Sequence, residues 1–217
     1  MPHVVQPLFD TTYAVALSQL ETAHQHLVRC AQDSLLASTL DATRWGIQTK
    51  RLVVDLTDNA PDLIGKRNEK FGEIINIAAT IERLIPAIRW FSLHSEFKAL
   101  TIRECHPSTS DENGGNDLVL IDSDGNVSVR CEVCDVASSN AGSNGKEKKD
   151  IRNLGCTQNV PDDSVARYIC TAPEFAVALT NPKRKWKQLP YQYKCTTLGD
   201  VADTRLLRVV PAEEIAT

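Results

Sequence analysis

The middle of the chain carries two short apolar runs separated by a turn signal. Residues 118–121 read Leu-Val-Leu-Ile and residues 127–131 read Val-Ser-Val-Arg-Cys, which is typical of strands. Asp124-Gly125 between them is a strong signal for a two-residue hairpin turn. Centring the turn there places Asp117 opposite Glu132. The pattern therefore predicts a β-hairpin with two carboxylates facing each other across the strands.

Asp117 and Glu132 would then be cross-strand neighbours, whose Cβ atoms lie roughly 5 Å apart. Two carboxylates at that separation repel each other, so both stay ionised at low cost only if a cation or hydrogen-bond donors lie between them. Because both acids sit among Val, Leu, Ile and Cys, we prefer a metal site to a pair of solvated acids. Oxygen-only ligation favours Mg²⁺, which also takes waters and substrate phosphates as ligands.

The N-terminal part of the chain is predicted to be helical. Apolar residues recur at helical spacing from a cap at Asp10 or Thr11 to about Ser38. A second helix-like pattern follows Pro61, and Pro86 should kink or end it.

More strands and helices are predicted around the hairpin. A strand is expected before it, over residues 98–105, and a charged helix after it, over residues 146–154. The later candidates are strands at 167–171, 191–197 and 205–210 and a helix at 173–179. This order favours an α/β fold of one domain, residues 1–217, with a mainly helical N-terminal region (1–95) and a mixed-sheet core (96–217).

The acids and their surroundings resemble the PD-(D/E)xK nuclease superfamily, the core shared by many type II restriction endonucleases. The matching features are an Asp that opens one strand, an acid on the next strand, and a helix after it, within roughly residues 70–172. The resemblance implies a restriction-endonuclease-like mixed sheet flanked by helices, with Mg²⁺ held by Asp117 and Glu132. In that family a Lys two residues after the second acid positions the attacking water or neutralises phosphate charge. This chain has Cys134 there.

A thiol cannot supply a fixed positive charge, because the ordinary pKa of a cysteine is about 8.5 and its ionised form is negative. We therefore expect a relocated cation near the position of Cys134. The candidates are Arg130, which the two-residue strand period places on the face of Glu132, and Lys146, Lys148 and Lys149. Lys146 is preferred because the polar loop before it brings it near the strand end. A catalytically weakened nuclease fold is the alternative.

Glu73 is a further candidate for the metal shell. It lies on the second predicted helix, and many members of the resembled superfamily place a Glu on the helix before the sheet. An exposed, salt-bridged Glu explains the position equally well.

Basic residues gather in two segments, one beside the proposed site and one near the C-terminus. Phosphate contact is a natural use of both, although solvated charge runs are common. The candidate DNA-binding residues are Lys148, Lys149, Arg152, Lys183, Arg184, Lys185 and Lys187.

The composition of the chain limits which partners the protein can bind and in which cellular compartment it is expected. A net charge of −4 argues against a uniformly basic coat, but local patches suffice to contact phosphates. The N-terminus lacks a charged region followed by an apolar stretch, and no run approaches the roughly 20 apolar residues of a membrane span. Together with an odd number of cysteines, seven, this predicts a reduced, cytoplasmic protein outside the membrane.

Cys131 and Cys134 form a CxxC pair, which raises the question of zinc. Positions three apart on a strand point to opposite faces, so we expect core cysteines and keep a zinc-stabilised interaction module as an alternative.

The function implied by the resemblance is a Mg²⁺-dependent endonuclease for double-stranded DNA, most like a type II restriction enzyme. Such an enzyme would be a homodimer, because palindromic sites favour two-fold symmetry, and the N-terminal helices are the expected dimer surface. A DNA-binding protein without activity on the same fold and a repair or recombination nuclease remain alternatives.

Overall fold

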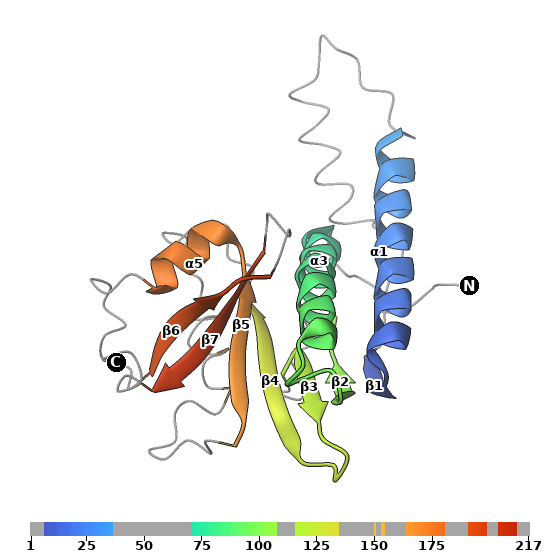
Figure 1. Cartoon of the computed structure of the whole chain (residues 1–217). Helices are drawn as coiled ribbons and strands as arrows, with labels where there is room; N and C mark the ends of the chain where they lie inside the picture. The colour runs from blue at the N-terminus through green and yellow to red at the C-terminus, as the bar shows by residue number, and fades with distance from the viewer. Residues whose placement is uncertain are drawn as a thin grey trace.

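The computed structural model shows a mixed β-sheet with helices against both of its faces (Figure 1). The residues that it describes are 7–36, 71–107, 116–134, 150, 153–154, 164–180, 191–198 and 204–211. The helices within these ranges are α1 (Tyr13–Leu36), α3 (Phe71–Leu93) and α5 (Pro173–Thr180). The strands are β1 (Leu8–Thr11), β2 (Thr101–Cys105), β3 (Leu118–Ile121), β4 (Val127–Cys134), β5 (Ala166–Thr171), β6 (Tyr191–Thr196) and β7 (Arg205–Pro211).

The sheet has seven strands in the order β1-β2-β3-β4-β5-β7-β6. Strands β1 to β4 pair antiparallel, β4 and β5 pair parallel, and the β5–β7 and β7–β6 pairs are again antiparallel. A parallel neighbour requires the chain to cross back along the sheet between β4 and β5. The prediction of an α/β fold with a mixed sheet and a helical N-terminal region is confirmed.

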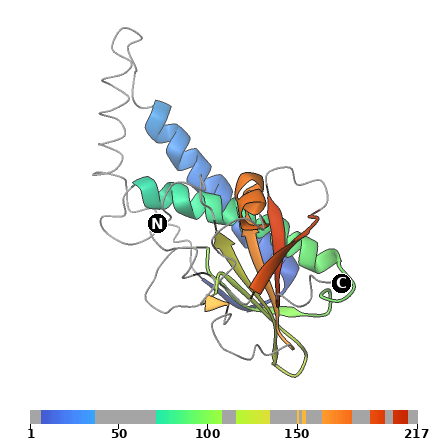
Figure 2. The same cartoon turned by 90° about the vertical axis from the view of Figure 1, so that its left-hand side faces the viewer.

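Side-chain alternation divides β4 between the two faces of the sheet. Val129, Cys131 and Val133 join the apolar cluster beneath α1 and α3, whereas Cys134 belongs to the cluster beneath α5. Figure 1 shows α1 and α3 together on one side of the sheet and α5 apart from them; in the turned view of Figure 2, α5 lies in front of the other two helices. Both faces of β4 are therefore buried toward its end, where the charged Glu132 lies between the buried Cys131 and Val133.

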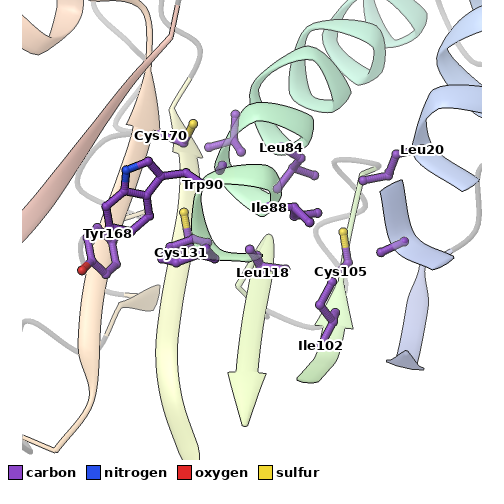
Figure 3. Packing of buried hydrophobic residues seen from close by; sticks show 14 of the residues in the cluster. Leu20, Leu84, Ile88, Trp90, Ile102, Cys105, Leu118, Cys131, Tyr168 and Cys170 are labelled. Atoms are coloured by element: carbon purple, nitrogen blue, oxygen red, sulfur yellow. The ribbon is translucent and has the colours of Figure 1, made fainter. Parts of the chain in front are cut away.

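Helix α3 is the central element of the larger cluster. Ile77, Ile81, Leu84, Ile88 and Phe91 recur at spacings of three and four residues, and all are buried. Figure 3 shows Leu84 and Ile88 of this helix on the side of α1 and Trp90 beside Tyr168 of β5. The stripe therefore holds the sheet and α1 together through one helix.

The outer edges of α1 and α3 are polar. His24 of α1 contacts Glu82 of α3 at 2.7 Å, and Arg89 of α3 pairs with Glu21 of α1. In the part of the chain that the structure describes, no helix is long and apolar enough to cross a membrane.

Of the two outcomes predicted at Pro86, a kink or an end, the end is wrong, because α3 continues through Pro86 to Leu93. A proline inside a helix removes one hydrogen bond and costs about 3 kcal/mol. Leu84 before it and Ile88 and Phe91 after it lie in the same buried cluster. Their shared packing favours continuation over a break.

The start of the first helix also differs from the prediction. The cap is Thr12, whose carbonyl accepts from the Ala16 N–H at 3.0 Å and whose Oγ1 accepts from the Val15 N–H at 3.4 Å. The residues before Thr12 form β1, which pairs with β2, so Asp10 lies in a strand and not at a helix cap. Asp10 has a left-handed backbone, with φ of 46°.

The β3–β4 turn is one residue longer than predicted, yet the register farther on agrees. The N–H of Asp122 bonds the carbonyl of Asn126, and Gly125 takes the left-handed conformation with φ of 83° that a three-residue loop requires. Ile121 opposes Val127, but a bulge then shifts the register so that Leu118 opposes Cys131. The bulge offsets the extra turn residue, and the ladder ends at that pair; Asp117 precedes it in a bend, with its carboxylate bonded to the Val133 N–H.

Replacing Phe91 with Ala should destabilise the protein by about 3–5 kcal/mol, because a fully buried ring leaves a cavity. The rings of Phe97 and Tyr168, each 5.2 Å from Phe91, would lose their edge-to-face partner. Urea unfolding measures the effect. Leu93→Ala is the matched control two residues away, at a side chain that is 81% exposed, and should change stability by less than about 0.5 kcal/mol. Equal losses for the two variants would contradict the packing.

Asp122 should stabilise the turn in a pH-dependent way. Its carboxylate accepts hydrogen bonds from the N–H groups of Asn126 and Asp124 and from the Asn126 side chain. These bonds, led by the Asn126 N–H, lower the pKa of Asp122 below its usual value. The stabilisation is therefore present above the ordinary Asp pKa and is lost as the pH falls through the lowered folded-state value.

The expected result is that Asp122→Asn destabilises the protein at pH 7 and that the difference from wild type shrinks at pH 3. Asp124→Asn, in the same turn, is the control and should show a smaller pH-dependent difference. Urea unfolding at the two pH values measures both. A difference for Asp122→Asn that does not change with pH would refute the role of the charge.

Candidate functional site

The candidate site lies where β3 begins and β4 approaches its end. Asp117 occupies a bend just before β3, and Glu132 lies within β4. On its other side, β4 pairs in parallel with β5, where Glu132 is opposite Ile169. Three adjoining strands therefore support the two predicted acids.

Glu132 is buried, with only 3% of its surface exposed, and a polar network surrounds its carboxylate. The Asn116 Nδ2 donates to Glu132 Oε1 at 2.6 Å, and the Asn116 Oδ1 accepts from Arg130 Nη1 at 3.0 Å. Burial of a charge is costly unless donors meet it, and Asn116 is one such donor. Arg130 and Glu132, two residues apart on β4, both reach the same amide.

Asp117 is tied to the main chain of its neighbours. Its Oδ2 accepts from the Val133 N–H at 2.6 Å, and its carbonyl accepts from the His106 N–H at 2.8 Å. The first bond meets β4 one residue beyond Glu132, and the second meets the residue that follows β2. The Asp117 carboxylate is therefore held at the same end of β4 as Glu132.

Both acids contribute to the raised pKa of one buried thiol, that of Cys131. Burial raises the pKa of Cys131 well above its usual value, and the charges of Cys170, Asp117, Glu132 and Cys105 raise it further in that order. Burial also raises the pKa of Cys105 to about 12, with a smaller contribution from Asp117. Negative potential from both Asp117 and Glu132 thus reaches the sheet interior at Cys131.

The donor set suits a hard cation, but only in part. Asp117 and Glu132 offer carboxylate oxygens, which Mg²⁺ prefers. Over the described stretches of chain, no group of three or more His, Cys, Asp or Glu side chains gathers to hold a metal. A Mg²⁺ ion at this place would therefore take waters and substrate oxygens as most of its ligands, which is ordinary for this ion.

Cys134 is a core residue. It is 1% exposed and packs with Ile169 and Phe175 beneath α5. The Thr171 hydroxyl donates to its carbonyl at 2.6 Å. The position at which the resembled superfamily has Lys is therefore a buried thiol in this chain.

The CxxC pair is not a zinc chelate. Cys131 lies in the cluster beneath α1 and α3, and Cys134 lies in the cluster on the opposite face. The prediction of core cysteines is confirmed for these two residues, because the sheet separates their thiols.

The other predicted site residues fall outside what the structure describes. The backbone of Glu73 belongs to α3, but its side chain is outside the described part. The basic candidates outside the described residues are Lys146, Lys148, Lys149, Arg152, Lys183, Arg184, Lys185 and Lys187.

Asn116 is the site residue that the sequence analysis missed. The available signal was a second polar residue directly before Asp117. In the name PD-(D/E)xK of the resembled superfamily, that position is a proline. A strand's alternation would put adjacent residues on opposite faces, but the bend at Asp117 lets both reach β4. Asn116 is 2% exposed, and such burial of an amide indicates a specific partner.

Thiol labelling should separate Cys195 from the cysteines of the sheet interior. Cys195 is exposed, whereas Cys105, Cys131, Cys134 and Cys170 are buried. Because the thiolate is the reactive form, the raised pKa values of Cys105 and Cys131 protect them further.

Iodoacetamide labelling at pH 7.5, mapped by peptide mass spectrometry, should modify Cys195 in the folded protein and the interior four only after urea is added. Rapid modification of Cys131 in the folded state would show that the sheet interior near the two acids is open.

Comparisons of this chain with protein-family models, with curated proteins and with solved structures found no match. The case for a function therefore depends on the residues and geometry of the site itself.

Proposed function

We propose that the protein is a Mg²⁺-dependent endonuclease that hydrolyses phosphodiester bonds in double-stranded DNA, most like a type II restriction endonuclease. The observation that carries the proposal is the placement of Asp117 and Glu132 at one end of β4, each held by a hydrogen bond of 2.6 Å. Preorganised carboxylates of this kind suit a divalent cation and a phosphate substrate.

The order of elements supports the same proposal. A helix, α3, precedes three antiparallel strands, β2 to β4, and the chain then crosses back to place β5 parallel to β4. The resemblance implied an Asp that opens one strand, an acid on the next strand and a helix after it. The two strands follow this order, and most of the segment expected to form that helix, residues 146–154, lies outside the described residues. The remaining strands, β6, β7 and β1, extend the sheet at its edges.

Each residue would have a distinct task in the reaction. Asp117 and Glu132 would hold Mg²⁺, which supplies positive charge to the scissile phosphate and its attacking water. The Val133 N–H fixes Asp117, and the Asn116 amide fixes Glu132, so neither carboxylate has to reorganise when substrate arrives. In the proposal, Glu73 contributes to the metal shell and Lys146 or a neighbouring cation replaces the motif lysine.

The proposed partners follow from the substrate. Phosphate contacts are assigned to two basic clusters, Lys148, Lys149 and Arg152 in one and Lys183, Arg184, Lys185 and Lys187 in the other. The active form would be a homodimer, paired through the N-terminal helices, because a two-fold protein matches a palindromic site. The reaction would take place in the cytoplasm.

One observation favours a second candidate, a DNA-binding protein of the same fold without activity. Cys134 is a buried core thiol, so the position expected to carry a lysine carries no cation. If no other side chain replaces that charge, the chain would bind DNA without cutting it.

Replacing Glu132 with Gln should abolish Mg²⁺-dependent cleavage of phage or plasmid DNA, lowering the rate by at least about a hundredfold. The amide keeps the size of the side chain and an oxygen toward Asn116 but removes the charge that binds the cation. Circular dichroism should show a folded variant.

Asp124→Asn is the matched control, because Asp124 lies in the turn at the far end of the same hairpin. It should cut at the wild-type rate. Undiminished cutting by Glu132→Gln would reject the proposed site, and wild-type protein that binds varied DNA tightly without cutting it would favour the second candidate.

A further inference from the structure

The Glu132–Asn116–Arg130 network runs from the interior of the sheet toward the solvent. Glu132 and Asn116 are 3% and 2% exposed, whereas the Arg130 side chain is only partly buried. The inner end of the network is a carboxylate and the outer end is a guanidinium. One amide lies between them and contacts both.

The orientation of the Asn116 amide follows from its neighbours. A carboxylate can only accept and a guanidinium can only donate, so the amide nitrogen must face Glu132 and the amide oxygen must face Arg130. The reverse orientation would place two acceptors against each other on one side and two donors on the other. Asn116 therefore fixes the positions of both charged groups relative to each other.

Arg130 has opposite effects on the two ligands that the site would take. Its positive charge makes the surroundings of Glu132 less negative, which disfavours a divalent cation when no anion is present. A phosphate oxygen reverses this, because it is attracted both by the cation and by the guanidinium, which binds phosphates in a bidentate manner. The geometry thus couples cation binding to phosphate binding.

We propose that Arg130 is a phosphate-binding residue of the candidate site and that Asn116 is the positioning residue that aligns it with Glu132. The proposal rests on the proposed function and deepens it, because it names a described residue as the cation that Cys134 does not supply. Arg130 would then take the role of the motif lysine, and Lys146 is the alternative residue for that role.

Arg130→Gln tests the assignment through two binding measurements besides cleavage. Calorimetric titration with Mg²⁺ in the absence of DNA should give an affinity equal to or tighter than that of wild type, because a repelling charge is gone. Affinity for a double-stranded oligonucleotide in Ca²⁺, measured by fluorescence anisotropy, should fall by about tenfold to a hundredfold, as expected for a lost charge-assisted hydrogen bond. A purely structural role would weaken both affinities together.

Arg103→Gln provides the matched control. Arg103 lies on β2, its side chain is 50% exposed, and it pairs with Glu104 at 3.8 Å. The same change of charge at this position should leave both affinities within about twofold of wild type.

Asn116→Leu tests the positioning role, since leucine has the same branched arrangement of side-chain heavy atoms as asparagine and makes neither hydrogen bond. At saturating DNA its kcat should fall by at least about tenfold, whereas Arg130→Gln should act mainly by raising KM. Asn116→Gln keeps an amide with a donor for Glu132 and an acceptor for Arg130, so its DNA affinity should exceed that of Asn116→Leu. Equal DNA affinity for the two Asn116 variants, with both folded by circular dichroism, would refute the positioning role.

The failures of the two proposals are distinguishable. If wild type cuts DNA, and Arg130→Gln binds and cuts like wild type while Lys146→Ala does not, the assignment of Arg130 is overturned and the nuclease stands. If wild type cuts no DNA but Arg130→Gln still weakens its binding in Ca²⁺, the nuclease is overturned and the phosphate contact stands. If neither wild-type cleavage nor DNA binding is found, both fall.

Discussion

The buried carboxylate of Glu132 requires hydrogen-bond donors, and the local structure around it provides one. A charge that is almost entirely removed from water is tolerated only when such donors meet it. Asn116 is brought to Glu132 because β3 begins two residues later and is paired with β4 through Leu118 and Cys131. The hairpin register therefore determines whether the charge is satisfied. A shift by one residue would exchange the faces of β4 and place Glu132 among the apolar side chains beneath α3.

Asp117 strengthens the same arrangement from the other strand. By accepting from the Val133 N–H, its carboxylate continues the attachment of the two strands beyond the last residue pair of the ladder. The two acids thus have different supports, one a buried side chain and the other the main chain. This combination places both carboxylates at one end of β4, and their charges add to the effect of burial, which raises the pKa of the nearby Cys131 thiol.

Local patterns in the sequence predicted most elements and the placement of Asp117 and Glu132 at the same end of the β3–β4 hairpin. Periodicity and turn residues act over a few positions, so the hairpin, the later strands and the two long helices could be identified. The turn was wrong by one residue because Gly125, and not the Asp124-Gly125 pair, determines the loop. The bulge in β4 offset that error, and no feature of the sequence predicted the bulge. β1 was missed because its four residues become a strand only by pairing with β2, more than ninety positions later.

The chemistry of the site was less accessible from the sequence than its location. The acids stood out as charges in apolar strands, but the partner of Glu132 depends on the bend at Asp117, which breaks the alternation that strand patterns assume. Continuation of α3 through Pro86 depends likewise on tertiary packing that overrides a local preference. Contacts between residues far apart in the chain are difficult to predict from a single sequence, because no local pattern marks them.

The short β1 strand has a consequence for how copies of the protein meet. It lies at one edge of the sheet, where unpaired main-chain groups invite another strand. Its four residues include an exposed Asp10 with a left-handed backbone, so the row of donors and acceptors is interrupted as well as brief. Such an edge is a poor template for intermolecular β-pairing, and at high concentration this margin of the sheet resists the ordered aggregation that a longer, flatter strand would promote.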